Sequence, residues 1–261
     1  MKDVYICFTP YHIILSCAIA FAKNDKIEND LIIQPSFPNV DNFIDGIKEW
    51  NDNLFNEIIE IPGRYESKPR NIKIISTIEN IYKYKRANQL LKRKYNHTMI
   101  NNLYIFNDCS LSGQLLAYLN DQNGGCNIYV EDGMAAYINQ IPSRSIRQLL
   151  ARHIYKLTFG KWYEQNEKQG LCKYIDKFMV LNPQHIRIDL SKKNINAIEL
   201  EDIFNLNTTG LPNKITKQFN LNISKRENVT ILILSPSYFL IENGILNKCK
   251  NIINQIVEKK F

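Results

Sequence analysis

The sequence predicts an α/β fold with a mostly parallel sheet and helices on both faces. Three observations support this prediction. Short apolar runs alternate with longer stretches of helical spacing, polar or turn residues follow the apolar runs, and the composition, 44% hydrophobic and 23% charged, is that of an ordinary globular protein. Strands that alternate with helices favour parallel pairing through crossover connections. The length of 261 residues fits one large domain or two of ordinary size.

The first unit of this fold is a strand at residues 4–8 followed by a helix that begins near Pro10. Proline suits the first turn of a helix, where its missing N–H removes no hydrogen bond. The apolar residues of the helix recur at helical spacing, as Ile13, Ile14, Cys17, Ala18 and Phe21. Together they predict a βα unit with a polar loop at residues 9–12.

The alternation then continues along the chain. Further strands are predicted at residues 31–34, 55–61, 103–106, 127–130 and 177–181, and helices at residues 42–50, 71–95, 114–118 and 142–156. Pro62 and Gly63 end the third strand, and the turn at residues 123–125 precedes the fifth. We assign these elements to an N-terminal Rossmann-like domain at residues 1–204.

A domain boundary is expected at residues 205–228, where the hydrophobic pattern gives way to Asn, Thr, Lys, Gly210 and Pro212, as in a linker. Residues 229–234 then predict a strand and residues 243–260 a helix. We interpret residues 229–261 as the first βα unit of an incomplete second α/β domain, because one strand and one helix cannot bury a core. Either this unit docks on the first domain or the chain is a shortened version of a longer protein.

The net charge of +7 favours anionic partners such as a nucleotide donor, an acidic saccharide or the face of a membrane. Six cysteines show no metal-ligand spacing, and we interpret them as reduced thiols of a cytoplasmic protein. No signal peptide is predicted, and the apolar residues 13–22 are too few to cross a bilayer. Any membrane association is expected to be peripheral, at the inner face.

The stretch at residues 127–137 carries the clearest chemical signal. A short apolar strand runs into Glu131, Asp132 and Gly133, and in an open α/β sheet reactive groups collect past the carboxyl ends of strands. Either acid can serve as a base if its neighbour and burial raise its pKa. The same residues also suit a helix N-terminus and a tight turn, so a capping role stays open.

Two other strand ends carry candidate binding residues. Thr9 and His12 follow the first strand and face the same crevice as the acidic pair in this fold, although each also suits a helix N-terminus. Asn107 and Ser110, with Gln114, follow the fourth strand and are able to bind sugar or phosphate oxygens or to cap a helix. The remaining histidines lack a suggestive neighbour and favour structural or surface roles.

Several function classes are disfavoured by missing motifs. The sequence contains no GxxxxGK[ST] or GxGxxG loop and no GxSxG elbow, which argues against a P-loop nucleotidase, a Rossmann dehydrogenase and an α/β-hydrolase. No acidic pair on a metal-ligand pattern accompanies Glu131 and Asp132, so metal-independent chemistry is expected. Residues 82–97 combine six cations with tyrosines and no acid, which fits a solvated helix face or a surface for anionic lipid, glycan or nucleic acid.

The N-terminal run VYICFTPYH at residues 4–12, with YVEDG at residues 129–133, resembles the bacterial sialyltransferases of glycosyltransferase family 52 and the related capsular polysialyltransferases. The resemblance covers about residues 1–240 and rests on the acidic motif. It implies a GT-B architecture, with residues 1–204 as the acceptor-side domain and residues 229–261 as the start of an incomplete nucleotide-binding domain. It also implies transfer of sialic acid from CMP-sialic acid to a capsule or lipooligosaccharide glycan, with inversion, no metal and no cofactor besides the donor.

In that family the acid of the D/E-D/E-G motif is the general base, which maps onto Glu131 or Asp132. The family's His-Pro pair, which supports the leaving CMP phosphate, has no counterpart in this sequence and is expected beyond Phe261. A nucleotide-sugar donor and a glycan acceptor are the expected partners, without nucleic acid, and a homodimer stays open. The alternatives are a catalytically inactive glycan- or partner-binding remnant and a GT-B enzyme with another nucleotide-sugar donor.

Overall fold

The structure is a computed structural model, and it describes residues 1–23, 27–51, 53–63, 73–131, 133–138, 154–164, 166, 168–191, 194–197 and 210–219. The chain divides into two compact units, Met1–Asn222 and Ile223–Phe261. All described residues belong to the first unit. The predicted strand at 229–234, the predicted helix at 243–260 and the second domain they would begin therefore lie outside the described residues.

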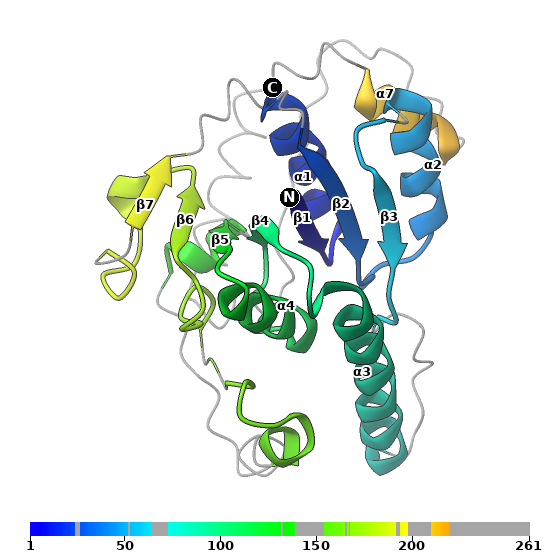
Figure 1. The fold of residues 1–261 in the computed structure, drawn as a ribbon. Helices are drawn as coiled ribbons and strands as arrows, with labels where there is room; N and C mark the ends of the chain where they lie inside the picture. Colours follow the sequence, from blue (N-terminus) through cyan, green and yellow to red (C-terminus); the bar gives the residue numbers. More distant parts are fainter. Residues whose placement is uncertain are drawn as a thin grey trace, which may run out of the picture. The chain divides into compact units, whose positions relative to one another are not determined.

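Seven parallel strands form one sheet in the order β3-β2-β1-β4-β5-β6-β7, which Figure 1 shows from right to left. The strands are β1 (Lys2–Cys7), β2 (Glu28–Ile33), β3 (Glu57–Glu60), β4 (Ile100–Ile105), β5 (Cys126–Val130), β6 (Lys177–Val180) and β7 (Asn194–Ala197). The first six positions have the strand order of a Rossmann-like doubly wound sheet. The predicted α/β fold with a parallel sheet is confirmed.

Helices connect the strands. They are α1 (Pro10–Lys23), α2 (Val40–Asn51), α3 (Lys73–Tyr95), α4 (Leu111–Gln122) and α7 (Leu211–Gln218), with short 3-10 helices η1 (Gly133–Ala136) and η2 (Pro183–His185). Residues 154–159 are also helical, and they overlap the end of the helix predicted at 142–156. None of the described helices is long and apolar enough to cross a bilayer.

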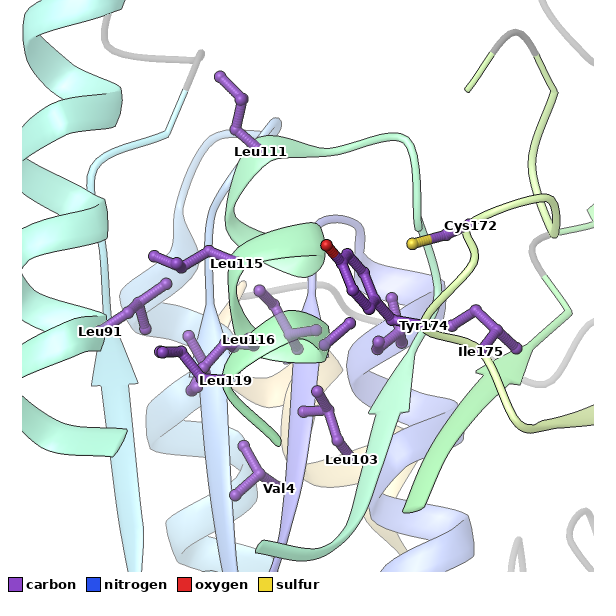
Figure 2. Close-up of a cluster of buried hydrophobic side chains, with 14 of the residues drawn as sticks. Val4, Leu91, Leu103, Leu111, Leu115, Leu116, Leu119, Cys172, Tyr174 and Ile175 are labelled. Carbon is purple, nitrogen blue, oxygen red and sulfur yellow. The ribbon is translucent and has the colours of Figure 1, made fainter. Parts of the chain in front are cut away.

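Side chains of each central strand alternate between two hydrophobic layers, one on each face of the sheet. Val4 and Ile6 of β1 belong to the layer under α3 and α4, and Tyr5 and Cys7 belong to the layer under α1, α2 and α7. In Figure 2, Leu91 of α3 points toward leucines of α4. Both faces are therefore covered, which explains why β1 is apolar at successive positions.

Two described elements differ from the sequence-based prediction. Strand β7 was not predicted, because Asn194–Ala197 contains two asparagines and one β-branched residue at the edge of the sheet. Helix α7 lies inside the segment that was expected to be linker. Its Leu211 and Ile215 are buried in the layer that α2 also covers, and Gly46 of α2 permits this approach because a Cβ there would lie 3.0 Å from Ile215 Cα.

The strand order places a topological switch between β1 and β4. The chain leaves β1 toward β2 on one side and leaves β4 toward β5 on the other. The two loops therefore separate at the carboxyl ends of these strands and leave a crevice, which is the usual ligand position in open parallel sheets. A ligand site is therefore expected at the segments that follow Cys7 and Ile105.

Candidate functional site

A cavity of about 480 Å³ lies at this switch point, within the volume range of small-molecule sites. The segments after β1, β2 and β4 contribute to it, together with α3 and residues 154–164. Its lining residues are Phe8, Thr9, His12, Gln34, Pro35, Ser36, Tyr84, Asn107, Cys109, Ser110, Leu111, Tyr155 and Tyr163. The cavity therefore brings together, at the carboxyl ends of the central strands, residues that are distant in the sequence.

Thr9 and His12 form the start of α1 on one side of the cavity. The Thr9 Oγ1 accepts a hydrogen bond from the His12 N–H at 3.3 Å, as an N-cap does. The Phe8 N–H donates to His12 Nδ1 at 3.1 Å, and the imidazole stacks on Phe106 with ring centroids 4.7 Å apart. Because Nδ1 accepts, the neutral ring carries its proton on Nε2. The bond at Nδ1 and the stacking on Phe106 thus orient the His12 ring.

Asn107 and Ser110 perform the same function for α4 on the other side. Ser110 Oγ accepts from the Gly113 N–H at 3.0 Å and donates to the Asn107 carbonyl at 2.8 Å. Asn107 Oδ1 accepts from the Cys109 N–H at 3.0 Å. Ser110 therefore caps α4 and Asn107 shapes the loop before it, and both side chains also line the cavity.

The electrostatics of the cavity come from its backbone. The N-termini of α1 and α4 both begin at its lining residues, and neither helix has an acidic residue in its first turn. Its lining residues include no Asp, Glu, Lys or Arg. The positive ends of the two helix dipoles are therefore not neutralised by a lining side chain. The site offers hydroxyl, amide and aromatic groups beside the N-termini of two helices.

Glu131 joins the end of β5 to the end of β6. It is 3% exposed, and its Oε2 accepts the Leu181 N–H at 2.7 Å and the Tyr137 hydroxyl. The Tyr137 hydroxyl in turn accepts from the Asn182 N–H at 3.0 Å, and burial, followed by the bond to Glu131, raises the Tyr137 pKa. Gly133, at φ 57°, begins η1 and is exposed. Asp132 lies outside the described residues.

A buried arginine fastens the same loop to the rest of the domain. Arg187 is 3% exposed and donates from its guanidinium to the Ala135 and Gln169 carbonyls, both at 2.6 Å. Its Nε donates to Asp189 at 3.0 Å, which contributes to the lowered pKa of that carboxyl despite partial burial. The segment after Glu131 is thus anchored by a side chain from a distant part of the sequence.

Asp108 anchors a second loop, beside the cavity. Its carboxylate accepts the Gly170 N–H at 2.8 Å and the Cys172 N–H at 2.9 Å, and burial raises its pKa although these bonds oppose the shift. The sequence did contain a signal for Asp108, because this acidic residue follows a strand and lies between Asn107 and Ser110. Its structural role depends on residues about 60 positions away, which no local pattern reveals.

Comparison with known proteins assigns no family. No protein-family model matches the chain, and no curated protein matches it either. The part of the chain that the structure describes also contains no group of three His, Cys, Asp or Glu side chains arranged to hold a metal ion. The assignment of function therefore rests on the site geometry and on the sequence motifs.

The structure brings four predicted residues together and leaves two described ones outside the cavity lining. Thr9, His12, Asn107 and Ser110 line one cavity, whereas Glu131 and Gly133 are not among the lining residues. Sequence reasoning missed the aromatic wall formed by Tyr84, Tyr155 and Tyr163. These tyrosines come from α3 and from residues 154–164, and only tertiary packing places them beside the loops of β1 and β4.

Proposed function

We propose that this protein is a sialyltransferase-like glycosyltransferase that transfers sialic acid from CMP-sialic acid to a cell-surface glycan, with inversion and without a metal. One observation carries the proposal. Two loops chosen from the sequence, Thr9–His12 and Asn107–Ser110, meet in one cavity, and the next strand of the sheet, β5, ends at the acidic motif. This arrangement supports an acceptor pocket beside a catalytic acid, as the family resemblance implies.

The chemistry of the cavity supports a saccharide as the acceptor. Tyrosine rings offer flat apolar faces for a sugar ring, while Gln34, Ser36 and Asn107 offer polar groups for its hydroxyls. A lining without charged side chains suits neutral hydroxyl groups, and the two helix N-termini tolerate an acidic group. The acceptor is thus a sugar, neutral or acidic, rather than a cationic compound.

We assign the general base to Asp132 rather than Glu131. The Glu131 carboxylate is buried and accepts bonds from Leu181 and Tyr137, so it positions the loop instead of facing substrate. In the proposed step, the Asp132 carboxylate takes the proton of the acceptor hydroxyl. The hydroxyl oxygen bonds to the anomeric carbon of sialic acid, and the bond from that carbon to the phosphate oxygen breaks to release CMP.

The surface of α3 supports peripheral contact with an anionic membrane, where such glycans are assembled. Lys85, Arg86, Lys92 and Arg93 are exposed, and Tyr82 on the same helix is 69% exposed. The seven-residue separation from Lys85 to Lys92 and from Arg86 to Arg93 places these cations on one helix face. Cations with an exposed aromatic ring are typical of a surface that binds acidic lipid headgroups.

The experiment that tests the function is donor binding followed by transfer. Calorimetric titration of CMP, UDP and GDP into the chain is expected to give binding by CMP alone. A radiolabelled transfer assay with CMP-sialic acid and a panel of glycan acceptors then measures turnover. Selective binding of UDP or GDP indicates another nucleotide-sugar donor, glycan binding without turnover indicates a binding protein, and no binding of CMP or glycan contradicts the proposal.

A further inference from the structure

Three neighbouring strands bring three cavity residues to one level. Strands β2, β1 and β4 lie side by side in the sheet (Figure 1). The register of β1 and β2, continued by one residue, places Phe8 level with Gln34, and the Gln34 N–H donates to the Cys7 carbonyl at 2.8 Å. The register of β1 and β4, continued by two residues, places Phe8 level with Asn107. Gln34, Phe8 and Asn107 therefore form a row along the cavity, about 10 Å long from two strand spacings.

The row continues the face of the sheet that α3 and α4 cover. Phe8 belongs to the hydrophobic layer of that face. Ile32 and Ile105 belong to it as well, and each lies two positions before a polar member of the row. Residues two positions apart along a strand share a face. The cavity also receives lining residues from α3 and from the start of α4, so the row lies on the cavity side of the sheet.

A backbone contact fixes the orientation of the Gln34 amide. Gln34 is 5% exposed, and its Nε2 donates to the Pro62 carbonyl at 2.8 Å. The amide nitrogen is therefore the end that faces the protein backbone. Among the residues that the structure describes, no donor is bonded to Oε1, and this oxygen is not one of the enclosed unpaired atoms. Gln34 thus offers a hydrogen-bond acceptor to the cavity that it lines.

The amide of Asn107 has the opposite orientation. Its Oδ1 accepts the Cys109 N–H at 3.0 Å, so the amide oxygen is the end that the backbone holds. Its Nδ2 is bonded to no acceptor within the described ranges and is likewise not one of the enclosed unpaired atoms. Asn107 thus offers a hydrogen-bond donor to the same cavity. The two amides at the ends of the row present complementary groups, with an aromatic ring between them.

We propose that Gln34 and Asn107 determine which acceptor sugar binds. The sugar ring lies on Phe8, one of its hydroxyl groups donates to Gln34 Oε1, and another of its oxygen atoms accepts from Asn107 Nδ2. A site that binds a hydroxyl group in this way rejects an analogue that lacks it, because the protein oxygen then stays unpaired. The inference rests on the proposed function for the reaction, and on the row for the residues that select the sugar.

Sugar analogues test the role of Gln34. Methyl β-galactoside and methyl α-sialoside are titrated into the wild-type protein by ligand-observed NMR, and at least one is expected to bind. One monodeoxy analogue of that sugar is expected to bind wild type about tenfold more weakly, and to bind Gln34→Met no more weakly than the parent sugar does, since both changes remove the same bond. No binding of either sugar overturns the proposal, and so does a set of analogues that Gln34→Met and wild type distinguish equally.

Asn107→Asp gives a second measurement that does not depend on the Gln34 variant. Aspartate keeps an oxygen for the Cys109 N–H and replaces only the donor, and its charge suits the start of a helix. The variant is expected to keep its melting temperature and to bind the sugar about tenfold more weakly, the equivalent of one hydrogen bond. Unchanged sugar affinity in folded Asn107→Asp protein overturns the proposal.

Asn56→Asp is the matched control. It makes the same change of charge at an exposed position that does not line the cavity, and it is expected to leave sugar affinity unchanged. Equal weakening in both aspartate variants overturns the assignment of Asn107. The two proposals fail separately: wild-type protein without transferase activity, in which Gln34 distinguishes one sugar hydroxyl, contradicts only the function. Normal transfer with an unaltered acceptor KM in Gln34→Met and Asn107→Asp contradicts only the role of the row.

Discussion

Adjacent residues of the acidic motif have separate tasks in the proposed mechanism. The buried side chain of Glu131 accepts bonds from the Leu181 N–H, just after β6, and from the Tyr137 hydroxyl, which describes a structural carboxylate. Its neighbour Asp132 is then the candidate base. Adjacency in sequence does not imply a shared role.

Substitution of each acid by its amide separates the two roles. Asp132→Asn is expected to lower kcat by about 10²–10⁴-fold and to leave the melting temperature unchanged, since a general base contributes that much. Glu131→Gln is expected to destabilise the fold by about 1–3 kcal/mol, because an amide oxygen accepts the Leu181 and Tyr137 bonds more weakly than a carboxylate oxygen does. Transfer kinetics and thermal unfolding measure the two effects. The opposite pattern would assign the base to Glu131.

Asp108 predicts an unusual dependence of stability on pH. Burial raises its pKa in the folded protein above the unfolded value of about 3.9. Its contribution to stability is therefore complete below that unfolded value and is lost as pH rises through the folded pKa. Asp108→Asn lacks this titration. The free energy of unfolding of wild type minus that of Asp108→Asn is thus expected to decrease between pH 4 and 7, as measured by urea denaturation, and a difference that increases with pH would contradict the assignment.

At the scale of elements, the sequence predicts the alternation of strands and helices through β6, because buried parallel strands are apolar and their helices keep a regular spacing. It does not predict β7, where Ile195 is the single β-branched residue, or α7, where Gly210 and Pro212 conceal the spacing of Leu211 and Ile215. Four residues that line the cavity were found from strand ends, but the tyrosine wall depends on packing that local patterns do not encode.

The close approach of Ile215 to Gly46 predicts that the packing of α7 against α2 requires a glycine at this position. Gly46→Val is expected to displace α7, since a side chain there would overlap the backbone of Ile215. Hydrogen exchange of the amides at residues 211–219 is expected to rise at least tenfold, while exchange in β1 stays slow. Asp45→Ala, at an exposed neighbouring position, is the control and is expected to leave this exchange unchanged. Protection of α7 in Gly46→Val protein would mean that the packing is not required.

For the whole molecule, the net charge of +7 is concentrated in part on the outer face of α3. A cation near an anionic bilayer contributes about 1 kcal/mol, and a few together produce measurable binding that salt weakens. The same helix carries Tyr84 on its inner side, at the cavity. In this proposal, α3 therefore contributes side chains both to the membrane-facing surface and to the acceptor pocket.

Vesicle sedimentation tests this surface. Binding to vesicles that contain phosphatidylserine is expected at low salt and absent from neutral vesicles. The pair Arg86→Gln and Arg93→Gln is expected to weaken binding at least tenfold. The pair Lys48→Gln and Lys161→Gln removes the same charge from exposed positions elsewhere and is the control. Equal loss in both pairs would attribute binding to net charge alone.

The place of β1 in the sheet has a consequence for synthesis on the ribosome. β1 is the first strand to emerge, yet its second neighbour, β4, is completed about 100 residues later. At roughly 5–20 residues per second, that delay is on the order of 5–20 s. Throughout it, one edge of the most buried strand is open to pairing with another nascent chain. Chaperone capture of early intermediates is therefore expected to matter more for yield than the stability of the finished domain.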